Sequence, residues 1–162
     1  MRLAVYPDGA VVVTAPSYFA VRVVEYFLAK HAAWVQRKVD ATKGKTVIRI
    51  ARRDIPELKQ QALALAQVRC TEYAALYGVS FRKISIRAQK TRWGSCSHSG
   101  NLSFNYRIAA LPAHLAEYVI VHEMCHLLEL NHSAEFWQHV ARAVPEHKAI
   151  RKEIRNLAII FI

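Results

Sequence analysis

Two histidines four residues apart, with a glutamate beside the first, form a motif that is typical of metal sites. His122, Glu123 and His126 make up the pattern H-E-x-x-H. On an α-helix, residues i and i+4 lie on one face, so both imidazoles aim at the same point. The arrangement suits tetrahedral zinc, which binds histidine nitrogens at about 2.0–2.1 Å. It also places a carboxylate within reach of a water on the metal, as general base. The motif therefore predicts a hydrolytic zinc site.

A catalytic zinc site usually has three protein ligands and one open position, so a third ligand is expected. The spacing favours His132, six residues after His126. On a continuous helix, six residues correspond to a net rotation of about 240°, which would turn His132 away from the metal. We therefore expect the helix to end between the two histidines. Asn131 is suited to this end because asparagine tolerates the left-handed conformation that terminates helices.

The motif leaves alternatives for the third ligand and for the role of the two histidines. Glu135 and His139, on the helix that follows, are alternative third ligands. His114 precedes the motif by about 12 Å along the helix axis, which is too far. The two histidines could instead be hydrogen-bonded core residues, although burying two histidines and a glutamate in an apolar helix without a ligand is costly. The zinc could also be structural, but Cys125 is expected to pack in the core and not to bind metal.

The elements that must position these residues follow from apolar periodicity and turn residues. Asp-Gly at residues 8–9 predicts a hairpin of residues 2–6 and 10–14. A later helix should begin with Asp54 as N-cap and end at Gly78, and the H-E-x-x-H helix should be buried because it is apolar on most sides. The other predictions are helices over 18–40, 112–130, 133–144 and 146–156, strands over 81–88, 91–97 and 101–108, a strand or loop over 46–51, and an apolar strand or tail over 157–162.

Length and composition indicate one globular domain. The chain has 162 residues, of which 53% are hydrophobic and 22% charged, enough to bury a core. Within this domain we expect an N-terminal hairpin and helix over 1–45 and a metallopeptidase-like core over about 54–156. No apolar run has the length of a membrane span, and the first residues lack the pattern of a signal peptide. Three cysteines without a C-x-x-C pair favour a reducing, cytoplasmic compartment.

A strong excess of positive charge is the other feature of the composition. The formal net charge is +11, which favours contact with anions such as nucleic acid. Basic residues gather before the H-E-x-x-H helix, at Arg82, Lys83, Arg87, Lys90 and Arg92. A nucleic-acid partner bound through this basic face is therefore one prediction, and a solvated basic face is the alternative.

The motifs, taken in order, resemble the YgjP-like metal-dependent hydrolases, which are similar to the SprT-like and WLM zinc peptidases. The resemblance covers residues 89–151, with RWGSCS at 92–97, GNLSFN at 100–105, YVIVHEMCH at 118–126, NHS at 131–133, and Phe136–Trp137. It implies an α+β, zincin-like metallopeptidase fold in which a small antiparallel or mixed sheet packs on helices, one of them the buried H-E-x-x-H helix. It also implies one zinc ion held by His122, His126 and His132, with Glu123 as general base.

The resemblance further implies a strand near the cleft, around residues 93–105, that pairs with an extended peptide. Candidate substrate-binding residues on and beside this strand are Arg92, Trp93, Asn105 and Tyr106. Arg92 or Tyr106 is a candidate to stabilise an oxyanion. For Trp93, a place in the core of a bent strand is an equal alternative, since Gly94 beside it lets another backbone approach closely.

The sequence thus predicts a zinc metallopeptidase that cleaves peptide bonds in a peptide or protein substrate. The metal activates water, and Glu123 accepts and returns the proton. Nickel or cobalt could replace zinc at a three-histidine site. The alternative is a zinc-containing nucleic-acid-associated protein or a binding module with little or no turnover.

Overall fold

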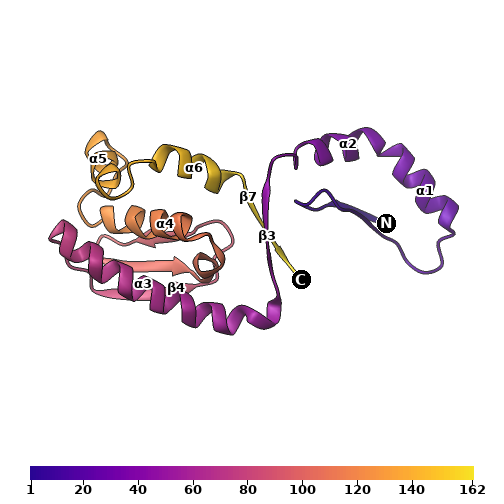
Figure 1. The fold of residues 1–162 in the computed structure, drawn as a ribbon. Coiled ribbons are helices and arrows are strands. Elements are labelled where there is room, and N and C mark those ends of the chain that lie inside the picture. The colour runs from indigo at the N-terminus through magenta and orange to yellow at the C-terminus, as the bar shows by residue number, and fades with distance from the viewer. The chain divides into compact units, whose positions relative to one another are not determined.

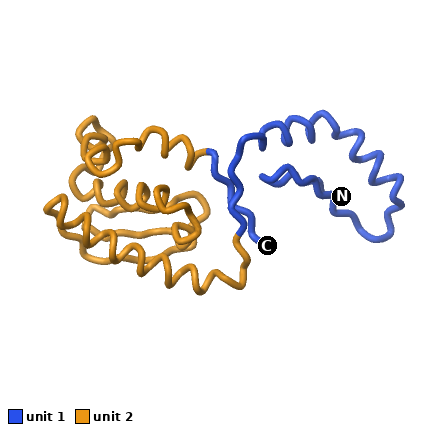
Figure 2. The backbone as a smooth tube through the Cα atoms, in the orientation of Figure 1, with its two compact units in different colours: residues 1–49, 156–162 blue, residues 50–155 orange.

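The structure, a computed structural model, describes all 162 residues and contains two compact units (Figure 2). The first unit comprises residues 1–49 and 156–162, and the second comprises residues 50–155. Figure 1 shows the order of the elements along the chain. None of the helices has both the length and the apolar composition that a membrane crossing requires. The prediction of a single domain over residues 1–162 stays a prediction.

The first unit contains a hairpin, two helices and a second pair of strands. β1 and β2 pair in antiparallel orientation as predicted, and Gly9 occupies the turn with φ 84°, a conformation that glycine adopts without steric cost. β3 and β7 form another two-stranded sheet. The bounds are β1 (Arg2–Val5), β2 (Val11–Thr14), α1 (Val21–Lys30), α2 (Ala32–Asp40), β3 (Thr46–Ile50) and β7 (Leu157–Phe161).

The single helix predicted over residues 18–40 is wrong, because the structure divides it at His31. The backbone of His31 leaves the helical conformation, with φ −104° and ψ 9°. Its imidazole Nδ1 donates a hydrogen bond of 2.8 Å to the carbonyl oxygen of Phe27. In a continuous helix, that carbonyl would accept the backbone N–H of His31 itself. The side chain thus replaces a helical hydrogen bond, while the apolar periodicity continues across the break.

The second unit packs helices against a mixed three-stranded sheet. β6 is the central strand, parallel to β4 and antiparallel to β5. This is the α+β arrangement that the sequence predicts. The bounds are η1 (Arg52–Asp54) and η2 (Tyr106–Ala110), both 3₁₀ helices; α3 (Ile55–Tyr77), α4 (Ala113–Cys125), α5 (Ala134–Ala143) and α6 (His147–Arg155); and β4 (Lys83–Arg87), β5 (Gly94–Cys96) and β6 (Asn101–Asn105).

α4, the helix that carries the H-E-x-x-H motif, lies at the centre of the second unit. It contacts α3, η2, β5, β6, α5 and α6, and Figure 1 shows it alongside the sheet. Leu115, Ile120 and Met124 of α4 are completely buried, as are Phe104 of β6 and Phe136 of α5. Full burial of such a side chain contributes about 1.5–3 kcal/mol. The prediction of a buried helix is confirmed, and the packing around it holds the motif in place.

Two predicted element ends in the second unit are wrong, and one predicted cap lacks its hydrogen bond. α4 ends at Cys125 and not near residue 130, and the chain continues in turns. The strand predicted over 101–108 ends at Asn105, because the Asn105 side chain accepts a hydrogen bond from the backbone N–H of Arg107 and starts η2. Asp54 is the N-cap residue of α3, as predicted, but its side chain makes no capping hydrogen bond, since η1 already leads into α3 and holds Asp54 in a helical conformation.

Candidate metal centre

The structure brings together the three histidines that the sequence predicts as ligands. One ring nitrogen each from His122, His126 and His132 lies within 4.8 Å of the other two. The Nε2 atoms of His122 and His132 are 3.1 Å apart. Two nitrogens bound to one tetrahedral zinc at about 2.0–2.1 Å would be about 3.3–3.4 Å apart. The three rings therefore have the spacing of a single metal site.

The chain reaches this geometry because the helix stops and a side chain closes the turn that follows. His126 is the C-cap residue of α4, with φ −67° and ψ −15°. The Oδ1 atom of Asn131 accepts a hydrogen bond of 2.9 Å from the backbone N–H of Ser133, and Ser133 caps α5 by accepting from the N–H of Phe136. The prediction that the helix does not continue to His132 is confirmed, although α4 already ends at Cys125, one residue earlier than the predicted range between the two histidines. Asn131 does not act through a left-handed backbone, since only glycines have positive φ.

Hydrogen bonding and burial prepare the imidazoles to act as ligands. The Nδ1 atom of His126 lies 3.0 Å from the carbonyl oxygen of Glu129. A carbonyl only accepts, so Nδ1 carries the proton and Nε2 keeps a free lone pair. Burial, together with the nearby His126 and His132, lowers the pKa of His122 to about 3. The ring of His122 is therefore neutral, which is the form that binds metal ions.

His122 supplies a second sign that the rings suit a cation. Its Nδ1 atom is buried without a hydrogen-bond partner, and its Nε2 atom faces another imidazole nitrogen. A buried polar ring without stronger partners is costly. A metal ion shared by the three rings would bind the converging nitrogens, such as Nε2 of His122, and would leave the His122 Nδ1 atom as it is. The fit to zinc and similar divalent ions therefore rests on the converging nitrogens.

Two aromatic side chains of α5 support the imidazoles. Phe136 stacks on His126, with ring centroids 4.6 Å apart and an interplanar angle of 29°. Trp137 stacks on His132 at 5.7 Å and 26°. These contacts limit rotation of both rings. Phe136 and Trp137 thus anchor the turn that carries His132.

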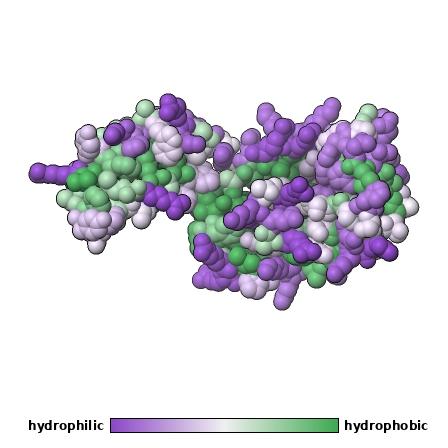
Figure 3. Space-filling view, turned by 180° about the vertical axis from the view of Figure 1, so that it is seen from behind, coloured by the Kyte–Doolittle hydropathy of each residue, from purple (hydrophilic) through white to green (hydrophobic).

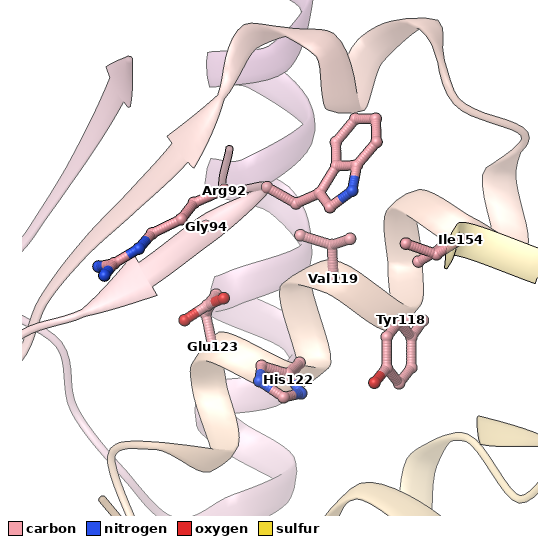
Figure 4. A pocket seen from close by; sticks show the side chains of 8 residues that line it. Arg92, Gly94, Tyr118, Val119, His122, Glu123 and Ile154 are labelled. Atoms are coloured by element: carbon pink, nitrogen blue, oxygen red, sulfur yellow. The ribbon is translucent and has the colours of Figure 1, made fainter. Parts of the chain in front are cut away.

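Glu123 lies on α4 between the histidines and β5. Its side chain points toward Gly94 (Figure 4), and only 7% of the residue is exposed. Burial raises the pKa of its carboxyl group to about 8, and the positive charge of Arg92 acts in the opposite direction. The carboxyl group therefore has a proton affinity suited to exchanging protons near neutral pH.

Two cavities meet at this carboxylate. Both are lined by Arg92, Gly94, His122 and Glu123. The first, of about 200 Å³, is otherwise mainly apolar and is completed by Trp93, Tyr118, Val119 and Ile154 (Figure 4). The second, of about 280 Å³, is completed by Ser95, Cys96, His126, Leu130 and His132. The cavity lined by the three histidines and the apolar cavity thus share one boundary, where Glu123 lies.

The four predicted substrate-binding residues divide into two pairs. Arg92 lines both cavities and Trp93 lines the apolar one. Asn105 and Tyr106 are buried and line neither cavity. The side-chain amide of Asn105 donates to the carbonyl oxygens of Gln89 and Arg92, at 2.6 and 3.0 Å. The structure therefore gives Asn105 a role in holding the segment that leads to β5.

The alternative ligands lie outside the group of converging nitrogens. His114 is hydrogen-bonded to Glu153 at 3.0 Å. The group includes neither Glu135 nor His139, and Cys125 is a buried free thiol. Sequence reasoning missed Tyr118, whose ring centroid is 5.8 Å from that of His122. The signal was available, because Tyr118 precedes His122 by four residues on the same helix face.

Comparisons with known proteins agree with this geometry. Residues 51–157 match the YgjP-like, metallopeptidase domain, while a comparison with curated proteins gave no match. The crystal structure of the metallopeptidase zymogen abylysin from Pyrococcus abyssi is similar, with a TM-score of 0.51 and 22% identity, over 55% of this chain and 90% of that chain. The zymogen of jannalysin from Methanocaldococcus jannaschii has a TM-score of 0.49 and 21% identity, over 55% and 92%. The likeness to abylysin supports a metallopeptidase fold.

Proposed function

The chain belongs to the YgjP-like metallopeptidase family, and we therefore propose that it is a zinc-dependent peptidase. The observation that carries the proposal is the convergence of three histidine nitrogens within 4.8 Å beside a buried carboxylate on the same helix. A three-histidine set leaves one position of a tetrahedral ion open, as catalytic sites require. The substrate class that follows is a peptide or an unfolded protein segment.

Each residue of the site has a distinct task in this proposal. His122, His126 and His132 would hold one zinc ion per chain. Bound zinc supplies a Lewis acid that polarises the scissile carbonyl and lowers the pKa of water toward about 7. Glu123 accepts a proton from the attacking water and delivers it to the leaving nitrogen. Burial favours this task because it raises the proton affinity of the carboxylate.

The surroundings of the site support an extended peptide as substrate. β5 is an outer strand of its sheet, paired with β6 alone. Its residues Gly94, Ser95 and Cys96 line the cavity that contains the histidines. We infer that a substrate runs along the free edge of β5 by main-chain hydrogen bonds. The apolar cavity beside Trp93 and Tyr118 would then accept an apolar side chain next to the scissile bond, and Arg92 would face the peptide backbone.

The Glu123→Gln variant tests this function, because the amide keeps the shape of the side chain but does not accept the proton. We expect zinc content to stay near one ion per chain while cleavage of an unfolded protein such as casein falls by at least about 10²-fold. Metal content is measured by mass spectrometry on the same samples. Glu117→Gln is a matched control, since Glu117 lies on α4 but bonds to Tyr73 and not to the site. Full activity of Glu123→Gln would exclude the proposed mechanism.

A further inference from the structure

Gly94 differs from the other glycines of the chain in the reason for its presence. The sequence contains five glycines. Four of them, Gly9, Gly44, Gly78 and Gly100, have positive φ, which explains the choice of glycine by backbone conformation. Gly94 is not among them. A residue with a side chain could adopt its backbone angles, so the reason for glycine must lie in the surroundings.

The surroundings of Gly94 leave no space for a methyl group. A Cβ atom built on Gly94 would lie 2.6 Å from Cγ of Glu123, and 2.9 Å from both Cδ and Oε1 of the same side chain. Cβ atoms in proteins essentially never approach other atoms within 3.0 Å. The nearest atom is in the middle of a buried side chain and not at a flexible end. An alanine at this position would therefore have to displace Glu123 or separate β5 from α4.

The strand is held too firmly to move away from the helix. Gly94 pairs with Phe104 of β6, whose side chain is completely buried. The backbone N–H of Asn105 donates a hydrogen bond of 2.7 Å to the carbonyl oxygen of Trp93. The Asn105 side chain also binds the carbonyl of Arg92. Because these contacts fix the backbone on the N-terminal side of Gly94, the Glu123 side chain is the part that would give way.

Van der Waals packing, and not hydrogen bonding, fixes the position of the Glu123 side chain. Its carboxylate takes part in none of the hydrogen bonds or ion pairs that bridge the rest of the second unit. Its position at the boundary of the two cavities depends on how closely β5 approaches α4. A glycine at position 94 permits the closest approach that any residue allows.

We propose that Gly94 is a positioning residue. Because it has no side chain, the Glu123 carboxylate can pack directly against β5, between the two cavities and beside the three histidines. The inference rests on the proposed function, since it assigns to Gly94 the alignment of the general base. A displacement of about 1 Å in such a group lowers turnover by about 10²-fold. The three atoms nearest to an added Cβ all belong to Glu123, so we expect this side chain to move first and the three histidines to stay in place.

The test compares two glycine-to-alanine variants of the full chain. For Gly94→Ala we expect kcat to fall about 10- to 100-fold, with KM and metal content unchanged. Gly78→Ala is the control, since Gly78 ends α3 with φ 66° and has nothing within 4 Å of an added Cβ. The strained backbone should lower its melting temperature by about 2–4 °C while kcat stays the same. This control separates loss of stability from loss of alignment.

Two outcomes would overturn the inference. One is a Gly94→Ala variant with the kcat of the wild type. The other is a variant that loses metal together with activity, because Gly94 would then act on the histidines and not on Glu123. A crystal structure of Gly94→Ala gives a readout without turnover: the Glu123 carboxylate should be displaced relative to the wild type. An unmoved carboxylate overturns the inference even if the wild type cleaves no peptide, which separates its failure from failure of the proposed function.

Discussion

The imidazole of His132 is the most exposed of the three converging rings, and its position depends on what packs beside it. Trp137 covers one face of the ring. The indole is itself packed against His147, with ring centroids 5.4 Å apart, and against the guanidinium of Arg151, 4.6 Å from the ring centroid. Stacking of this kind reduces the freedom of the His132 ring, so less entropy would be lost if the three histidines bound a metal ion.

Removing the His132 imidazole should therefore weaken metal binding at the proposed site. We expect His132→Ala to lower the zinc content of the purified protein well below one ion per chain, because two histidine ligands remain where three are needed. His114→Ala provides the control, since His114 bonds to Glu153 and should leave the zinc content unchanged. Metal analysis after dialysis against a weak chelator measures both variants. Equal zinc in the two would assign the third ligand to another residue.

The residues of the site differ in how far they could be predicted from the sequence. His122, His126 and His132 follow from helix periodicity and a short connection, so their convergence was predictable. The task of Gly94 depends on the distance between β5 and α4, which lie far apart in the sequence, and no local pattern reveals it. Asn105 has a polar side chain of the kind that often binds substrates, yet its amide donates to the carbonyl oxygens of Gln89 and Arg92 and holds the segment that leads to β5.

At the scale of elements, periodicity predicted which helices and strands exist, but hydrogen bonds decided where they end. The predicted helix over 18–40 breaks because a histidine side chain replaces a backbone donor. The predicted helix over 112–130 ends at Cys125, where turns begin. The first break involves a single side-chain hydrogen bond that a hydrophobic pattern does not contain, and the second falls within a stretch whose apolar periodicity continues past it. The second one matters for function, because it allows His132 to return to the site.

Ser133 is the N-cap residue of α5, next to His132, and its capping hydrogen bond should contribute to stability. Its hydroxyl accepts the backbone N–H of Phe136 at 3.3 Å, at the start of the helix that carries Phe136 and Trp137. Ser133→Ala should lower the free energy of unfolding by about 1 kcal/mol, as measured by urea denaturation. Ser80→Ala is a matched control at an exposed position in a connecting segment, with an expected change within about 0.5 kcal/mol. A Ser133→Ala variant as stable as this control would show that the cap contributes nothing.

At the scale of the whole molecule, the main feature is a strong excess of positive charge. The formal net charge is +11, and hydrophilic side chains cover much of the face seen in Figure 3. Around the site, Arg92 lines both cavities and Arg151 lies over Trp137. The predicted nucleic-acid partner stays a prediction. For the proposed peptidase activity, this net positive charge would favour the capture of acidic substrates.

We expect acidic peptides to bind more tightly than neutral ones at low salt, and this preference to disappear as salt rises. The comparison uses two peptides that differ only in Glu and Asp against Gln and Asn at positions away from the cleaved bond. In a buffer of about 0.01 M ionic strength, where charges act over about 30 Å, the acidic peptide should have the lower KM. At about 1 M the range falls to about 3 Å, and the two KM values should converge. The neutral peptide reports any effect of salt on the enzyme itself. If both peptides had equal KM at low salt, the net charge would play no part in substrate capture, and selectivity would have to come from the shape of the apolar cavity beside Trp93 and Tyr118.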